Sequence, residues 1–168
     1  MDLFGDCSAV ISNCERYRYR LDRRRNSLFS TAIIMVNPST ADADHDDSTI
    51  RKLLGFAERK GWGSIIVGNL FAYRATDVRK LATADDPIGP ENDFYLRTII
   101  GEADQVVVAW GPLTKQPKAL RDRWRSITDI AEPLGKVLLS IGSPALDGHP
   151  KHPLMLAYSE PIVPWRHP

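Results

Sequence analysis

Four short polar segments carry the side chains best suited to chemistry. They are NPST at residues 37–40, NLFAYR at 69–74, WGP at 110–112 and GHPKHPL at 148–154. A carboxamide can position a water molecule or match a planar polar edge, and an imidazole can stabilise a developing anion. These segments therefore supply candidates for a catalytic or binding site.

An apolar run leads into each of these segments and must position it. The runs are AIIMV, SIIVGNLF, VVVAW and KVLLSI, which begin at residues 32, 64, 106 and 136. Such uninterrupted runs are typical of parallel strands that helices cover on both faces. Apolar spacing predicts helices over 50–60, 91–100 and 118–130, the first capped by Asp47 or Ser48 and ended by Gly61. The alternation predicts an α/β three-layer sandwich with a mostly parallel central sheet.

The four segments should converge, because the carboxyl ends of parallel strands lie at one edge of a sheet and ligands bind beyond them. We expect Asn37 and His152 to be catalytic residues that share one pocket with Asn69, and Trp110 or Phe71 to lie near its wall. The full set of expected substrate-binding residues is Asn69, Ser39, Thr40, Phe71, Arg74, Trp110 and His149.

Each candidate also has a structural interpretation, and the sequence leaves both open. NPST is an ordinary turn composition. Asn69 is costly in so apolar a strand unless it is paired, so it either ties two loops together or reads a ligand edge. Loop histidines are often surface residues, and His149 and His152 compete for the same role. Trp110 is either a core residue or a platform for an aromatic ligand.

The N-terminal segment, residues 7–21, is predicted to form a hairpin. Period-two alternation places Arg16, Arg18 and Arg20 on one face, and the residues at 17, 19 and 21 on the other. The arginines could contact a nucleic-acid backbone, or they could be charges that protect an edge strand from aggregation. The second interpretation is the one we favour.

The composition is that of a globular protein: 168 residues, 43% hydrophobic, 26% charged, and a net charge of +1. We expect a single domain over 1–168, with the hairpin at 7–21 and an α/β core at 30–168. The first residues, MDLFGDCSAVIS, lack the basic and apolar regions of a signal peptide, and no apolar run is long enough to cross a bilayer. We therefore expect a cytoplasmic protein without membrane contacts.

Metal and cofactor motifs are weak in this sequence. Cys7 and Cys14 have no second pair, which makes zinc binding unpromising, and reduced thiols are expected in the cytoplasm. The cluster from Asp42 to Asp47 raises the question of an oxygen-ligated metal, but it lacks the calcium-loop pattern and suits a helix N-terminus. We expect no cofactor.

The motifs taken together resemble a known family. NPSTADADHDD, GNLFAYRAT, DDPIG, VVVAWG and GHPKHPL, which fall within residues 32–156, resemble an uncharacterised bacterial and phage family filed as a domain of unknown function. More distantly, their order resembles the uracil-DNA glycosylase superfamily, which has a parallel-sheet fold. That resemblance implies that Asn37 orients water, that Asn69 reads a base edge, and that His152 stabilises the departing base anion.

Three functions follow as hypotheses. The first is a glycosylase-like cleft that binds a nucleobase, nucleotide or nucleic acid and hydrolyses an N-glycosidic bond. The second is a non-catalytic binding or interaction module on the same fold. The third is metal-assisted phosphoester hydrolysis by Asp42 or Asp44 with His152.

Overall fold

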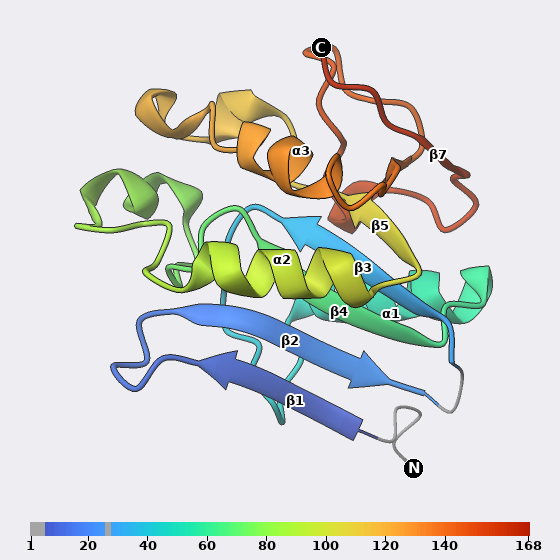
Figure 1. Cartoon of the computed structure of the whole chain (residues 1–168), viewed down its shortest axis with the longest axis horizontal. Coiled ribbons are helices and arrows are strands. Elements are labelled where there is room, and N and C mark those ends of the chain that lie inside the picture. The colour runs from blue at the N-terminus through green and yellow to red at the C-terminus, as the bar shows by residue number, and fades with distance from the viewer. Residues whose placement is uncertain (1–5, 26–27) are drawn as a thin grey trace.

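The computed structural model describes residues 6–25 and 28–168, which form a seven-stranded sheet with helices on both faces (Figure 1). The sheet order is β1-β2-β4-β3-β5-β6-β7. The strands are β1 (Asp6–Ile11), β2 (Arg18–Arg24), β3 (Ser30–Met35), β4 (Ser64–Asn69), β5 (Gln105–Val108), β6 (Leu138–Ile141) and β7 (Ile162–Pro164). The α-helices are α1 (Ser48–Lys60), α2 (Asn92–Glu102) and α3 (Arg125–Ala131), and short 3₁₀ helices are η1 (Val78–Thr83), η2 (Leu113–Lys115), η3 (Lys118–Leu120) and η4 (Pro153–Met155).

The four predicted apolar strands are neighbours and run parallel, in the order β4-β3-β5-β6. The expectation of a mostly parallel sheet is nevertheless wrong for the described residues, because three of the six strand pairings are antiparallel. A hairpin joins β1 to β2, and its two strands must therefore be antiparallel. β2 then pairs antiparallel with β4, and β7 returns along β6 at the opposite edge.

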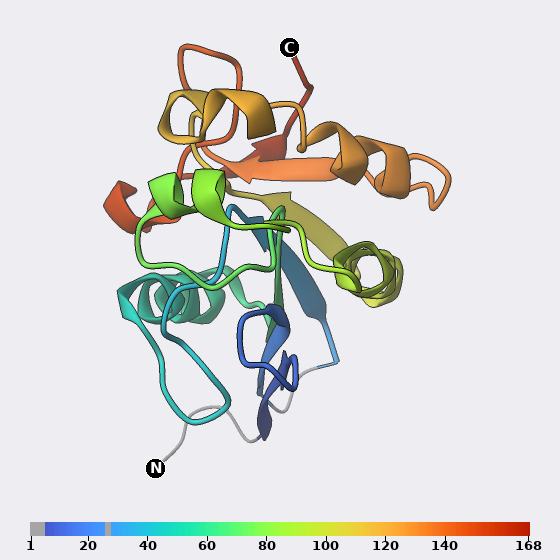
Figure 2. The ribbon, with the colours of Figure 1, turned by 90° about the vertical axis from the view of Figure 1, so that its left-hand side faces the viewer.

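Two apolar cores lie on the two faces of this sheet. Leu53 and Phe56 of α1 pack on one face, and Leu96 and Ile99 of α2 pack on the other together with α3. Figure 2 shows α1 and α2 on opposite sides of the sheet. Gly68 of β4 lets α2 approach closely, because a Cβ atom there would lie 3.0 Å from Leu96 and 3.1 Å from Ile99. The α/β layering is therefore as predicted.

The hairpin is confirmed, but the arginines of β2 do not share a face. The register between β1 and β2 shifts near Tyr19, which inserts an extra residue into β2 and breaks the period-two pattern. Arg18 donates to the carbonyl of Ala41 near α1, whereas Arg20 is paired with Glu102 of α2. β2 also lies inside the sheet between β1 and β4, so it is not the edge strand that we expected.

The helix predicted over 118–130 is only partly formed. Its first residues form η3 and a turn, and the α-helix starts at Arg125. Arg123 explains the interruption, because its guanidinium donates to the carbonyl of Leu70 and is paired with Asp93. These tertiary contacts override the apolar spacing that predicts one continuous helix.

The helix α1 agrees with the capping signals. Asp47 accepts a hydrogen bond from the backbone N–H of Ile50, and Gly61 ends the helix in the left-handed conformation. No helix in the described part of the chain is long and apolar enough to cross a membrane. Residues 1–5, at the start of the segment searched for a signal peptide, lie outside the described residues.

Candidate functional site

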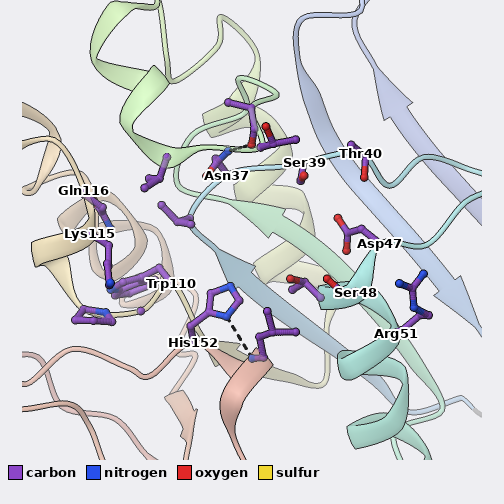
Figure 3. Close-up of a pocket in the computed structure, with 18 of the residues that line it drawn as sticks. Asn37, Ser39, Thr40, Asp47, Ser48, Arg51, Trp110, Lys115, Gln116 and His152 are labelled. Atoms are coloured by element: carbon purple, nitrogen blue, oxygen red, sulfur yellow. Dashed lines mark hydrogen bonds between the residues drawn. The ribbon is translucent and has the colours of Figure 1, made fainter.

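A cleft of about 790 Å³ lies at the carboxyl ends of β3 and β5 (Figure 3). The loop after β3 contributes Asn37, Ser39 and Thr40, and the loop after β5 contributes Trp110. The N-terminus of α1 forms the opposite side, and His152 enters from the long loop between β6 and β7. This edge of the sheet is where parallel strands are expected to hold a ligand.

The amide of Asn37 has a defined orientation. Its Nδ2 donates to the carbonyls of Pro38 at 3.1 Å and Ala75 at 2.8 Å. Since both partners are acceptors, the nitrogen must face them and Oδ1 must face away. Oδ1 accepts no hydrogen bond from the described residues and is not buried. Asn37 therefore lines the cleft with an Oδ1 acceptor whose orientation is fixed and which no described residue occupies.

His152 presents a hydrogen-bond donor. Its Nδ1 accepts from the backbone N–H of Leu154 at 3.2 Å, so the proton of the neutral ring lies on Nε2. Burial lowers the pKa of His152, and the charge of Asp47 raises it by a smaller amount. Figure 3 shows the ring between Trp110 and Ser48, held on its Leu154 side by that hydrogen bond. A neutral imidazole with a free Nε2–H can donate to a group that gains negative charge.

Gly111 lies beside His152 with φ at +81°, a conformation that favours glycine. A Cβ atom at Gly111 would contact the His152 Cβ at 3.4 Å, which is ordinary packing. We expect Gly111→Ala to lower the free energy of unfolding by about 1–2 kcal/mol through backbone strain. Urea denaturation measures this loss.

Gly135→Ala provides the matched control. Gly135 has φ at +65°, and a Cβ atom there would meet no heavy atom within 4 Å, so this position shares the strain but lacks the histidine contact. Equal losses of unfolding free energy in the two variants would show that backbone strain, and not the contact with His152, causes the cost. A Gly111→Ala protein as stable as the wild type would contradict the strain argument.

His149 supports the cleft wall from behind. It is buried, and its Nδ1 accepts from Trp110 Nε1 at 3.4 Å. Its ring packs against Trp124 and Trp165 at centroid distances of 5.1 and 6.0 Å. Burial lowers the pKa of His149. Of the two histidines that competed in the sequence, His152 lines the cleft and His149 belongs to the tryptophan cluster.

Three other predicted site residues lie away from the cleft lining. Phe71 is fully buried in the core shared with α2 and α3. Arg74 donates to the carbonyl of Glu15 in the hairpin turn. Asn69 is 1% exposed, and neither atom of its amide has a hydrogen-bond partner among the described residues.

Asn69 is nevertheless close to a small chamber beneath the cleft. The chamber has a volume of about 50 Å³, and Met35, Val67 and Arg18 are among its lining residues. Asn69 pairs with Met35 across the sheet and follows Val67 by two positions, so all three side chains lie on the same face. The chamber shares Asn37 and five other lining residues with the cleft.

A family model described as a protein of unknown function, DUF1643, matches residues 18–154. The chain belongs to the DUF1643 family. This confirms the resemblance to an uncharacterised family that its motifs indicated. No curated protein and no solved structure gives a significant match.

The sequence did not point to several residues of the DUF1643 cleft. Asp47 appeared only as a helix cap, although it lines both the cleft and the chamber. The others are Arg51, Lys115 and Gln116. Arg18, which the sequence offered only as a contact to a nucleic-acid backbone or as an edge-strand charge, lines the chamber. Figure 3 shows Lys115 and Gln116 on the Trp110 side and Arg51 on the α1 side. The only signal in the sequence was their proximity to strand ends and to the start of α1.

The acidic segment before α1 is organised by its own hydrogen bonds. Asp42 Oδ1 accepts from the backbone N–H groups of Asp44 and His45, each at 2.9 Å, and lies 3.1 Å from His45 Nδ1. These contacts lower the pKa of Asp42. Neither Asp42 nor Asp44 lines the cleft with His152, and the described residues hold no group of three or more metal-ligating side chains.

Proposed function

We propose that this cleft binds a nucleobase-containing ligand and hydrolyses its N-glycosidic bond. The observation that carries the proposal is the convergence of Asn37 and His152 from separate loops on one cleft. One presents a free acceptor and the other a free donor, each with its orientation fixed by backbone groups. Hydrolysis of this bond needs such a pair, because water must be held on one side while charge develops on the other.

The roles follow from these atoms. Asn37 Oδ1 accepts a hydrogen bond from water, whose oxygen forms the new bond to the sugar carbon and releases a proton to solvent. The carbon–nitrogen bond breaks, and its electron pair leaves with the base. His152 Nε2–H donates to the base as that negative charge develops. Ser39 and Thr40 supply hydroxyl groups at the same edge for the sugar.

The resemblance to uracil-DNA glycosylases supports the roles of Asn37 and His152 more than that of Asn69. Asn69 lies behind the chamber lining, so another group must take part in reading the base. Gln116 is a candidate, since it lies in the cleft wall near Trp110 and both atoms of its buried amide lack partners among the described residues. An amide of this kind offers both a donor and an acceptor to a base edge.

Base release under single-turnover conditions tests the proposal. The full chain is incubated in excess with uracil-containing single- and double-stranded DNA and with nucleotides carrying each common base, and free base is quantified. Release that falls in Asn37→Ala and His152→Ala but not in His45→Ala supports the proposal, because His45 is exposed and outside the cleft. Ligand binding without release overturns the hydrolase and favours a binding module on this fold.

A further inference from the structure

We propose that Arg18 binds the phosphate group of the ligand in the chamber beneath the cleft, which makes the ligand a nucleotide rather than a free base or nucleoside. The phosphate subsite stands on the geometry of Arg18 and of the chamber that it lines. Its assignment to a nucleotide rests on the proposed function. Arg18 is not among the residues that the glycosylase resemblance would place in a site.

Arg18 is a buried cation that forms no ion pair with the described residues. It is 3% exposed, and its side chain makes one hydrogen bond to described residues, from Nη1 to the carbonyl of Ala41 at 2.7 Å. Its Nε is buried and has no partner there. No carboxylate of the described residues lies within 4.0 Å of its nitrogens. Asp47 lines the same chamber, but the guanidinium lacks the direct ion pair that buried charges normally have.

Two other arginines of β2 differ from Arg18, because each forms an ion pair with a carboxylate. Arg23 is as buried as Arg18, yet it is paired with Asp46 at 2.7 Å and donates to the carbonyl of Asp42. Arg20 is paired with Asp22 and Glu102. Arg18 therefore differs from these arginines of its own strand, because it lines a cavity and pairs with no carboxylate of the described residues.

The surroundings of the chamber suit an oxyanion. Thr49, in the first turn of the 13-residue helix α1, lines it, and Ser39 adds a second hydroxyl group. A helix N-terminus and a guanidinium both favour phosphate. Burial lowers the pKa of Arg18 to about 10, and the charge of Asp47, which also lines the chamber, raises it by a smaller amount. The Oδ1 of Asp47 is already used by the backbone N–H of Ile50.

The position of the chamber fits the proposed reaction. Asn37 and His152 line both the chamber and the cleft, so they lie at the boundary between them. Arg18 lines the chamber together with the first residues of α1. A phosphate held there would direct the base toward Trp110, which lies across the cleft from Ser48 (Figure 3). The glycosidic bond would then fall between the acceptor of Asn37 and the donor of His152.

Thermal unfolding with inorganic phosphate tests the subsite directly. The Tm of the full chain should rise with phosphate at constant ionic strength, because a ligand that binds only the folded state stabilises it. Arg18→Met should weaken the phosphate response by roughly tenfold or more, since charge-assisted hydrogen bonds are lost. Arg97→Gln is the matched control, because it removes one exposed positive charge from α2. A purely structural Arg18 would lower Tm equally with and without phosphate.

Two further variants keep the test decisive if Arg18→Met does not fold. Arg18→Lys retains the charge without the planar fork, and Thr49→Val removes a hydroxyl group at nearly constant volume. Both should weaken the phosphate response while the Arg97→Gln response stays at the wild-type level. The inference is overturned if phosphate leaves the wild-type Tm unchanged, if the variants respond like the wild type, or if acetate stabilises as strongly as phosphate.

Uridine and uridine 5′-monophosphate separate this inference from the proposed function. Tighter binding of the monophosphate, with the difference lost in Arg18→Met, supports both. If phosphate raises the Tm through Arg18 but uridine 5′-monophosphate binds no more tightly than inorganic phosphate, the nucleobase proposal is overturned and the oxyanion subsite stands. Equal binding of nucleoside and nucleotide without a phosphate response overturns the subsite alone.

Discussion

His152→Ala is expected to slow base release by about 10²–10³-fold, the usual cost of removing one preorganised donor to a developing anion. Ligand affinity should change little, because Nε2–H donates most strongly when the base carries charge. Single-turnover rates and equilibrium binding measure the two effects separately. His152→Gln should recover part of the rate, because its amide can place a donor near the position of Nε2.

His149 provides the control for this prediction. His149→Gln should reduce stability, because the buried ring supports Trp110 and two other tryptophans, but it should change the rate only a few-fold. Equal rate losses at the two histidines would mean that cleft geometry, and not the His152 donor, controls release. Unchanged release in His152→Ala would remove His152 from the mechanism.

The same argument gives a pH dependence. Burial lowers the pKa of His152 below its ordinary value of 6.5, so the ring is neutral at pH 7. Protonation at lower pH would place a second N–H on Nδ1, opposite the N–H of Leu154. The rate should therefore be constant above about pH 6.5 and fall as the pH drops through the lowered pKa.

The free energy of unfolding should also fall as the pH drops. A histidine whose pKa is lower in the folded state binds fewer protons there than in the unfolded chain, so unfolding becomes easier as the pH falls below 6.5. His149 and His152 both contribute with this sign. A rate that rises steadily from pH 7 to pH 5 would contradict the neutral-donor role of His152.

The sequence predicted the parts of the fold that depend on continuous apolar runs and local capping. The four central strands and the caps Asp47 and Gly61 needed no knowledge of tertiary contacts. Their arrangement also places Asn37 and His152 at one edge, because strand ends of a parallel sheet share it. These signals depend on residues that are close together in the chain, and tertiary contacts do not override them in the folded protein.

The errors arise where a tertiary contact decides the structure. One inserted residue at Tyr19 places Arg18 and Arg20 on opposite faces of the sheet, where strict alternation predicts one face. No local sequence pattern indicates such a bulge. The interruption before α3 depends on Arg123 reaching Leu70, which is 53 positions away in the chain. The burial of Arg18 likewise follows from the bulge and from the loop that carries Ala41. An alternating arginine pattern predicts a charged surface, and for this reason the chamber was not foreseen.

Asn69 shows a different limit. The sequence indicated that a carboxamide in so apolar a strand needs a partner, and the structure places it where neither of its amide atoms has one among the described residues. Its neighbours Met35 and Val67 line the chamber, whereas Asn69 itself does not. Burial could be predicted from its strand, but its distance from the cleft depends on cross-strand packing.

Asn37→Ala is expected to slow base release by about 10²-fold, the cost that misplacing a reacting group by about 1 Å can carry. The substitution also removes the donor to the carbonyl of Ala75, which should lower the free energy of unfolding by about 1 kcal/mol. The loss of rate and the loss of stability have different origins, so a variant that loses only stability is needed to separate them.

Asn92→Ala is that variant. The Nδ2 of Asn92 donates to the carbonyls of Asn69 and Leu70 at 3.0 and 3.1 Å, much as Asn37 ties two carbonyls, but Asn92 is fully buried and lies outside the cleft. Asn92→Ala should therefore lose at least as much stability as Asn37→Ala while releasing base at nearly the wild-type rate. Urea denaturation and single-turnover release on the same preparations make the comparison. If Asn37→Ala behaves like Asn92→Ala in both measurements, Asn37 is a turn residue and the acceptor at its Oδ1 has no role in the reaction.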